Sequence, residues 1–400
     1  MAHMIKIAVL TNELPPYRRP VFDLLGRHEK LDVTIYLSTR KEPHRLWNPV
    51  PDSFSVRIKT VSSFSITLKQ QRRERLVHFP IGALGALLKQ RPHAVISGEF
   101  GFRTLLSAMY CFIFRKPLII WSEETILGAS TATVLQQFLR HFLSRMADGF
   151  LAWGQPARIY LHTFGISDDK ISLCAQAVDN DYWNKAVHKS IQNTVYYKHG
   201  LSGRTALFVG NLLRPKGVHH LIEAWALMPK ALQRENTLLL VGDGSEKARL
   251  EALVESLSAQ NVVFAGPVPH GELPAYYAAA NFFVFPTLLD VWGLVVNEAM
   301  ASGLPVLCSK YAGCAEELII PGQTGDVFDP ADTAAFSELL AQWLQTAHAT
   351  PDPAIQAHIQ RWNFESSVNG ILEQLVKVGI LSPGEAAACD SPLPKRSGSS

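Results

Sequence analysis

The sequence is poor in cysteine. Its five cysteines are odd in number and scattered over 400 residues, and no two of them form a Cys-x-x-Cys pair. This usage argues against a disulfide framework and against a zinc site, and it is typical of a reducing cytosol. We therefore expect a cytoplasmic chain that holds its fold by packing and not by cross-links.

Long apolar runs are missing as well. Residues 5–10 form an apolar run that is too short for a signal peptide. The best transmembrane candidate, residues 105–121, is broken by Arg115, Lys116 and Pro117. It also falls short of the roughly 20 apolar residues that a bilayer requires. The sequence therefore predicts neither a signal peptide nor a membrane-spanning helix.

Two phosphate-binding motifs are also absent. The loop at residues 11–20, after the first predicted strand, contains no G-x-G-x-x-G, and no G-x-x-x-x-G-K-[ST] occurs in the chain. These absences disfavour a dinucleotide site in the first domain and exclude a P-loop ATPase. No convincing cluster of metal-ligating residues stands out in the sequence either, so we expect no metal ion.

Acidic residues are scarce in the first half. Residues 1–190 hold 25 Lys and Arg against 15 Asp and Glu, a net charge of +10, whereas the remainder holds 13 against 20, or −7. The basic half favours an anionic partner, such as a membrane surface or a phosphorylated acceptor; the alternative is that the charge serves solubility alone. We expect no nucleic-acid partner.

One basic run lies within that half. Lys69, Arg72, Arg73 and Arg75 stand beside the apolar residues of the same stretch, 68–79. Such a segment either lies on anionic lipid, at the inner face of the cytoplasmic membrane, or is a solvated face.

The length and the hydrophobic pattern indicate two domains. A chain of 400 residues exceeds the usual size of one core. Short apolar runs alternate with helical patterns, which predicts an α/β fold of doubly wound parallel sheets. The expected strands are 4–10, 33–37, 94–96, 118–121, 149–153, 205–210, 237–241, 262–264, 282–285 and 305–308. Polar residues at 185–203 predict the linker, and the composition from 383 onward predicts a disordered tail.

The most informative stretch is residues 285–305, FPTLLDVWGLVVNEAMASGLP. A buried strand ends at Phe285 and a helix begins at Gly293, so unpaired N–H groups at the mouth of a strand suit a phosphate. Asp290 precedes that helix and Glu298 lies in its second turn. Carboxylates beside a phosphate site accept hydrogen bonds from sugar hydroxyls, which predicts a sugar-nucleotide pocket. The alternative is a surface helix that happens to carry acids.

A second loop points the same way. In LFVGNLLRPKGVHHLIEAW, residues 207–225, a strand and a glycine turn lead to Lys216 and Gly217 just before a helix. A cation at a helix start can neutralise a diphosphate. The alternative is a solvent-exposed lysine.

Residues 290–305 resemble the E-x7-E segment of family-4 retaining glycosyltransferases of the GT-B fold. In that fold two Rossmann-like domains face each other across a cleft, and the last helix crosses back to the N-terminal domain. The family more usually has Glu where Asp290 stands, and Glu298 matches the carboxylate that holds the nucleotide ribose. Asn211 takes the place of a family Arg, Lys216 matches the family Lys, and Arg214 offers a charge from the same loop.

The resemblance implies a set of donor-side residues. It makes Asp290, Glu298 and Lys216 catalytic. It places the nucleobase near Val268 and the nucleotide near Gly242. The full donor-binding set is Asn211, Arg214, Lys216, Gly217, Gly242, Val268, Asp290, Gly293, Leu294 and Glu298.

Acceptor-side residues are expected in the first domain. Ligands of open parallel sheets bind beyond the carboxyl ends of the strands. Glu99 and Glu123 follow two predicted strands, and Tyr17 and Arg18 lie in the loop after the first strand, which borders the acceptor in the family. Helix caps and solvated surface charges are the alternatives. The Pro15–Arg18 loop resembles that of enzymes of bacterial cell-surface polysaccharide assembly.

These observations give one expected function. Residues 1–188, completed by a helix at 362–380, form the acceptor-side domain, 200–361 bind the nucleotide sugar, and 383–400 form the tail. The protein transfers a sugar from a UDP- or GDP-linked donor to a hydroxyl of a glycan or lipid-linked acceptor, with retention and without metal or other cofactor. The alternatives are an epimerase or phosphorylase on the same fold and a non-catalytic, membrane-associated nucleotide-binding scaffold.

Overall fold

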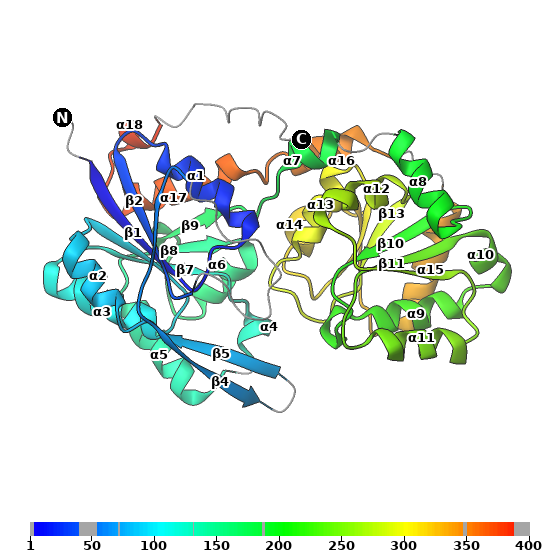
Figure 1. Cartoon of the computed structure of the whole chain (residues 1–400), viewed down its shortest axis with the longest axis horizontal. Coiled ribbons are helices and arrows are strands. Elements are labelled where there is room, and N and C mark those ends of the chain that lie inside the picture. The colour runs from blue at the N-terminus through cyan, green and yellow to red at the C-terminus, as the bar shows by residue number, and fades with distance from the viewer. Residues whose placement is uncertain are drawn as a thin grey trace. The chain divides into compact units, whose positions relative to one another are not determined.

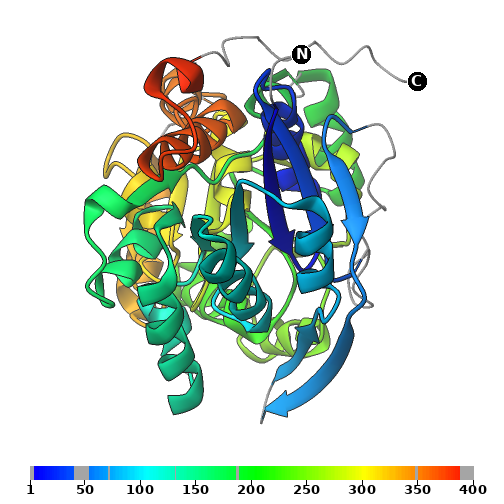
Figure 2. The ribbon, with the colours of Figure 1, turned by 90° about the vertical axis from the view of Figure 1, so that its left-hand side faces the viewer.

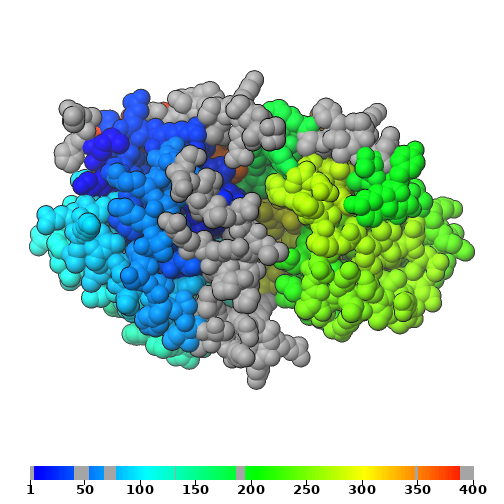
Figure 3. Space-filling model, in the orientation of Figure 1, coloured from blue at the N-terminus to red at the C-terminus, as the bar shows by residue number. Residues whose placement is uncertain are grey.

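The computed structural model describes residues 4–39, 54–70, 73–130, 132–185, 189–346 and 350–387 (coloured atoms in Figure 3). The chain divides into two compact units. The first unit comprises Met1–Ala175 and Phe364–Ser400, and the second comprises Gln176–Asn363. The division therefore falls 13 residues before the end predicted for the first domain (188 − 175).

The first unit is built on a parallel sheet of seven strands in the order β3-β2-β1-β6-β7-β8-β9. The strands are β1 Ile5–Thr11, β2 Leu31–Leu37, β3 Arg57–Thr60, β6 Ala94–Gly98, β7 Leu118–Ser122, β8 Gly149–Trp153 and β9 Ile171–Cys174. Its helices are α1 Arg19–Gly26, α2 Ala83–Gln90, α3 Phe102–Phe114, α4 Ile126–Ala129, α5 Val134–Met146, α6 Gln155–His162, α17 Phe364–Lys377 and α18 Pro383–Ala386.

Helices cover both faces of this sheet. Helices α2, α3 and α5 pack in sequence on one face, and α1 and α17 pack together on the other (Figure 1). All residues of β6, β7 and β8 are buried as a result, which is why their sequences are apolar without alternation. The last long helix, α17, thus completes the first unit.

The second unit has a parallel sheet of six strands in the order β12-β11-β10-β13-β14-β15. The strands are β10 Thr205–Val209, β11 Thr237–Val241, β12 Val262–Gly266, β13 Phe282–Phe285, β14 Val306–Ser309 and β15 Gly325–Phe328. The helices are α7 Asn180–Lys185, α8 Lys189–His199, α9 Val218–Leu227, α10 Lys230–Glu235, α11 Lys247–Ser256, α12 Leu273–Ala278, α13 Leu294–Ala301, α14 Ala315–Leu318, α15 Thr333–Gln345 and α16 Pro353–Ile359.

Side chains alternate between the two faces of the sheet along each strand, so this unit has a hydrophobic core on each face. Phe208 of β10 packs with α9 and α15 on one face, whereas its neighbours Leu207 and Val209 pack with α12 and α13 on the other. Successive side chains of a strand point to opposite faces, so a strand buried on both sides is apolar throughout. The predicted α/β class with two doubly wound domains is confirmed.

One segment had no predicted element, and two others differ from the expectations. The strands β4 Phe64–Gln70 and β5 Arg73–Phe79 form an antiparallel hairpin, which extends away from the seven-stranded sheet (Figure 2). The expected linker contains α8, and Val195 of that helix is buried in the second unit. The expected tail begins with α18, whose Ser382 caps it by accepting a hydrogen bond from Glu385 N; residues 388–400 lie outside the described chain.

Candidate functional site

The donor-side residues gather where the strand order of the second sheet reverses. Chain connectivity runs from β10 toward β11 and β12 on one side and continues through β13 and β14 on the other. The loops after β10 and β13 therefore follow two neighbouring strands from which the chain proceeds in opposite directions, and ligands of such sheets usually bind at this point. Residues 210–217 form the first loop and residues 286–293 the second.

These two loops are held against each other. Leu288 N donates to the carbonyl oxygen of Pro215 at 2.7 Å, and the Thr287 hydroxyl donates to the same oxygen at 3.1 Å. Gly217 has φ +69°, and a Cβ there would overlap the carbonyl oxygen of Pro286. Glycine is therefore required at 217 both by its conformation and by the close approach of the loops.

The predicted catalytic residues Lys216 and Asp290 meet across this junction. Lys216 Nζ lies 2.5 Å from Asp290 Oδ2, and the ammonium also lies 5.6 Å from the ring centroid of Phe285. Both side chains are partly exposed, so the pair is open to a ligand. Arg214 and Asn211 are exposed on the same loop.

Asp290 is positioned by backbone contacts on both sides. Its Oδ1 accepts a hydrogen bond from Trp292 N at 3.2 Å, and its carbonyl oxygen accepts one from Gly313 N at 3.0 Å. Gly293 then begins α13 with φ +104°, and a Cβ there would overlap the Phe285 ring. The first N–H groups of α13, beginning at Leu294, thus follow directly after the carboxylate.

Two buried hydrogen bonds in series hold the start of α13 in place. The indole N–H of Trp292 donates to Asn297 Oδ1 at 2.8 Å, and Asn297 Nδ2 donates to the carbonyl oxygen of Gln176 at 2.9 Å. Both side chains are buried, so these hydrogen bonds are shielded from water. These hydrogen bonds hold the loop that bears Asp290 against the start of α13.

Glu298 lies in the second turn of α13 and accepts a hydrogen bond from the Tyr277 hydroxyl at 2.9 Å. Burial raises the pKa of Glu298 to about 7, although the hydrogen bond from Tyr277 opposes the rise. Burial, together with the charge of Glu298, raises the pKa of Tyr277 well above its usual range, so this phenol stays a donor. Glu298 therefore titrates near neutrality, as functional carboxylates often do.

Gly242 and Val268 lie at the ends of the next two strands. Gly242 has φ +137°, donates its N–H to Gly266 O at 2.9 Å, and would overlap the carbonyl oxygen of Gly210 if it carried a Cβ. The ends of β10, β11 and β12 are thereby drawn together, with Val268 half-buried just beyond.

Sequence reasoning missed an aromatic group beside Glu298. The rings of Tyr182 and His270 stack with centroids 5.6 Å apart, and Trp183 packs edge-on against both His270 and Tyr277. Burial and then the charge of Glu298 raise the pKa of Tyr182. The adjacent aromatic pair at 182–183 was the available signal, but His270 joins it only through the fold.

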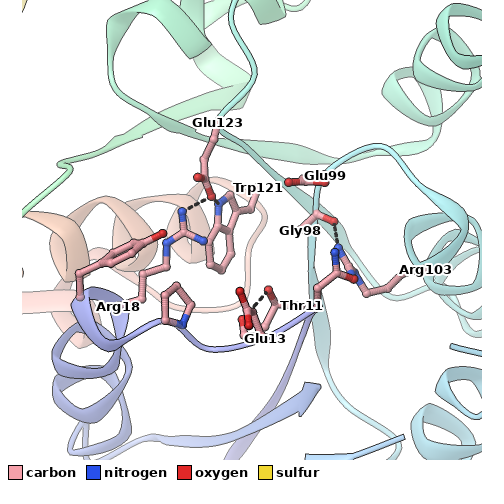
Figure 4. A pocket seen from close by; sticks show the side chains of 11 residues that line it. Thr11, Glu13, Arg18, Gly98, Glu99, Arg103, Trp121 and Glu123 are labelled. Atoms are coloured by element: carbon pink, nitrogen blue, oxygen red, sulfur yellow. Dashed lines mark hydrogen bonds and ion pairs between the residues drawn. The ribbon is translucent and has the colours of Figure 1, made fainter. Parts of the chain in front are cut away.

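The four predicted acceptor-side residues line one cavity in the first unit (Figure 4). The cavity has a volume of about 130 Å³ and lies at the carboxyl ends of β1, β6 and β7, where this sheet also reverses its order. Its lining is Thr11, Asn12, Glu13, Pro15, Tyr17, Arg18, Gly98, Glu99, Arg103, Trp121 and Glu123.

Arg18 is held in a fixed orientation within this cavity. It forms an ion pair with Glu123, and its guanidinium lies over the rings of Trp121 and Trp153 with distances of 4.4 and 5.0 Å to their centroids. The indole N–H of Trp121 also donates to Glu123 Oε1 at 2.8 Å. Figure 4 shows Arg18 and Trp121 converging on the Glu123 carboxylate.

Arg103 and Glu13 are the charged cavity residues that were not predicted from the sequence, and Arg103 is the more deeply tied into the fold. It lies in the first turn of α3, it is buried, and it donates to Gly98 O at 2.6 Å and to Asn12 Oδ1. Burial lowers its pKa, and the charge of Glu99 opposes that effect. Arg103 could have been identified from the sequence because it is the single charged residue within the apolar helix 102–114.

The described residues contain no group of three or more His, Cys, Asp and Glu side chains that could hold a metal ion. None of their helices is both long enough and apolar enough to cross a bilayer.

Solved structures show the fold class. The Anabaena protein HepE, in complex with UDP, superposes with a TM-score of 0.73 at 18% identity, covering 93% of this chain and 99% of that chain. The glycosyltransferase WaaG of lipopolysaccharide biosynthesis superposes with a TM-score of 0.61 at 17% identity, covering 96% and 98%. The chain has the GT-B fold of these glycosyltransferases.

One family model matches the second unit. Residues 197–357 match the model of glycosyl transferases group 1. The Escherichia coli O-antigen chain mannosyltransferase B is 32% identical over 187 residues, which are 46% of this chain and 48% of that protein. A GDP-mannose-dependent phosphatidylinositol monomannoside mannosyltransferase of Mycolicibacterium smegmatis is 36% identical over 36% of this chain and 41% of that protein.

These matches confirm the resemblance of residues 290–305 to glycosyltransferases of the GT-B fold. The chain spans about half or less of the length of both curated relatives, and the match lies where the donor-side loops are.

Proposed function

We propose that the protein is a retaining glycosyltransferase that moves a hexosyl group from a UDP- or GDP-linked sugar to a hydroxyl of a glycan or lipid-linked acceptor. The observation that carries the proposal is the Lys216–Asp290 pair at the switch point of the second sheet, followed at once by the start of α13. The HepE complexes with UDP and with UDP-glucose, and the GDP-mannose dependence of the mycobacterial relative, support this donor class.

The chemistry follows from charge. Breaking the bond between sugar C1 and the diphosphate oxygen leaves negative charge on the departing diphosphate. Lys216 and the first N–H groups of α13 would stabilise that charge, Asp290 would orient the sugar, and Glu298 would accept hydrogen bonds from the ribose. The acceptor oxygen then bonds to C1 on the same face, and its proton passes to a phosphate oxygen of the leaving nucleotide. Following the resemblance, the proposal includes no metal ion or other cofactor.

The cavity of the first unit supports a hydroxyl-rich acceptor. Glu13, Glu99 and Glu123 stand against Arg18 and Arg103, so the lining carries three carboxylates and two guanidinium groups. Carboxylates accept hydrogen bonds from hydroxyls, and guanidinium groups donate to their oxygens. An isolated anion would meet the excess carboxylate, whereas a sugar or polyol satisfies both kinds of group.

The test is nucleotide release from UDP- and GDP-linked hexoses, with and without glycan and lipid-linked acceptors. The proposal expects acceptor-dependent release from at least one donor and a product with the anomeric configuration of that donor by NMR. A donor isomerised without nucleotide release would instead show an epimerase, and release of a sugar phosphate would show a phosphorylase. Nucleotide binding with no turnover of any donor would favour the scaffold.

A further inference from the structure

Apolar side chains are concentrated on the solvent side of two neighbouring helices in the first unit. Of the 22 large apolar side chains that the described residues expose, ten lie within residues 102–146. Eight of them belong to α3 and α5, which pack side by side. We call this set the α3–α5 face, and it consists of Met109, Phe112, Ile113, Phe114, Val134, Leu135, Phe138 and Phe142.

The spacing on α5 places its members in one stripe. Val134, Phe138 and Phe142 follow at intervals of four, and their exposed fractions are 83%, 69% and 44%. Leu143, on the opposite side of α5, is fully buried in the core. A helix that is apolar on both sides is ordinarily covered on both, so this stripe indicates a partner that the isolated chain lacks.

Positive charges predominate around the face. Neither α3 nor α5 contains Asp or Glu, whereas Arg115 follows α3, Arg145 ends the α5 stripe, and Arg91 lies near Tyr110 of α3. All three arginines are exposed. The exposed carboxylate that follows α5, Asp148, accepts a hydrogen bond from Leu118 N at 2.8 Å.

This charge pattern distinguishes the possible occupants. A second copy of the chain packed through the same face would bring like cations together, because a two-fold interface pairs a surface with itself. Anionic lipid headgroups neutralise the arginines, and the acyl boundary accepts the aromatic and aliphatic side chains. A helix of 13 residues is about 20 Å long and can lie flat at that boundary.

We infer that the α3–α5 face docks on an anionic lipid bilayer. The inference rests on the surface alone and not on the proposed transfer reaction. Arg140, on the buried side of α5, forms an ion pair with Glu124 at 2.9 Å, next to the cavity residue Glu123. Docking would therefore hold the cavity rim beside the membrane, where a lipid-linked acceptor resides.

The test is flotation of the full chain with vesicles of phosphatidylcholine alone or mixed with phosphatidylglycerol. The inference expects binding only to the anionic vesicles, weakened at high ionic strength. Leu135→Glu combined with Phe138→Glu should reduce binding by more than about tenfold, because it removes inserted apolar groups and adds repelled charges. The matched control is Tyr197→Glu with Leu227→Glu, two exposed apolar residues of the second unit.

Circular dichroism and melting curves establish that each variant is folded, and light scattering gives its oligomeric state. Absence of binding to anionic vesicles overturns the inference, as does equal loss of binding in both double variants. It is also overturned if the wild-type chain is a dimer that the first double variant dissolves, while neither binds vesicles.

Discussion

The side chains of Lys216 and Asp290 form an ion pair with Nζ and Oδ2 2.5 Å apart. The two residues come from loops that follow different strands and that meet only because the sheet reverses its order between β10 and β13. In the proposed reaction the Lys216 ammonium turns from this carboxylate toward the diphosphate. The Asp290 carboxylate can then accept hydrogen bonds from the sugar. The pair therefore holds both groups in place before the donor arrives.

The first prediction concerns the charge of Lys216. Lys216→Met keeps most of the stem and removes the ammonium, so turnover should fall about 10²- to 10³-fold, the usual effect of removing one group that stabilises developing negative charge. Steady-state nucleotide release measures it. Lys230→Met is the control, since Lys230 is an exposed lysine whose ammonium donates to Ser258 O in the connection that precedes β12. Equal activity of the two variants would remove Lys216 from the mechanism.

The second prediction is that nucleotide affinity depends on the protonation of Glu298. Burial raises the pKa of Glu298 to about 7, and only the ionised carboxylate accepts hydrogen bonds from both ribose hydroxyls. Affinity should therefore rise about tenfold between pH 6 and pH 8. Calorimetric titrations with UDP and GDP at both pH values test it, with Glu255→Gln, on exposed α11, as the control. A flat profile in the wild-type chain would contradict the assignment.

Ionisation of Glu298 should raise nucleotide affinity but lower the free energy of unfolding. Its folded pKa of about 7 exceeds its ordinary value of 4.5, so between these values the folded chain retains a proton that the unfolded chain has lost. Glu298 therefore lowers stability as the pH rises through this window. Glu298→Gln should flatten that fall in melting curves at pH 5 and pH 8 while weakening nucleotide binding. A variant that melts lower by the same amount at both pH values would show that Glu298 is simply structural.

The third prediction separates two effects of adding a side chain at position 217: the overlap with the neighbouring loop and the cost of the backbone conformation. Gly217 and Gly322 have nearly equal φ angles of +69° and +70°, but a Cβ would overlap Pro286 O only at 217 and meets nothing at 322. Gly217→Ala should therefore cost about 1–3 kcal/mol more than Gly322→Ala, which bears the conformational cost alone. Urea denaturation gives both values, and equal losses would mean that the two loops are not packed as described.

The fourth prediction concerns the acceptor cavity. Arg18→Lys keeps the charge and loses the planar stacking over Trp121 and Trp153, so the acceptor KM should rise about tenfold or more while nucleotide affinity stays unchanged. Arg158→Lys is the control, because Arg158 forms an exposed pair with Asp168 in the same unit. An unchanged KM, or an equal fall in nucleotide affinity, would contradict an acceptor role for Arg18.

Local patterns were sufficient to predict much of the fold. Most strands of both parallel sheets are short apolar runs followed by glycine or polar turns. The edge strands β3, RIKT, and β15, GDVF, lack such a run and were not predicted. The charged residues of the loops at 210–217 and 286–293 can be identified directly from the sequence. The order of strands and loops along the chain shows that each of these loops follows the carboxyl end of a parallel strand. Lys216, Asp290 and Glu298 could therefore be assigned to the same edge of the sheet. The roles given to them stay predictions.

What could not be predicted depends on contacts between distant residues. The near-neutral pKa of Glu298 arises from burial beside Tyr277, which no local pattern encodes. Helix α8 has a polar sequence typical of a linker, yet Val195 is buried and His199 bonds the Tyr276 hydroxyl at 3.0 Å. Arg103 resembles a solvated helix start until the fold buries it. The basic run at 69–75 falls on side chains outside the described residues.

Lys216 and Glu298 should together bind a nucleoside diphosphate in the second unit. Titration calorimetry of UDP and of GDP against the wild-type chain and against Lys216→Ala combined with Glu298→Ala tests it most directly. We expect the wild-type chain to bind at least one nucleotide and the double variant to lose this binding while it remains folded. Equal affinity of the two chains for the same nucleotide would contradict it.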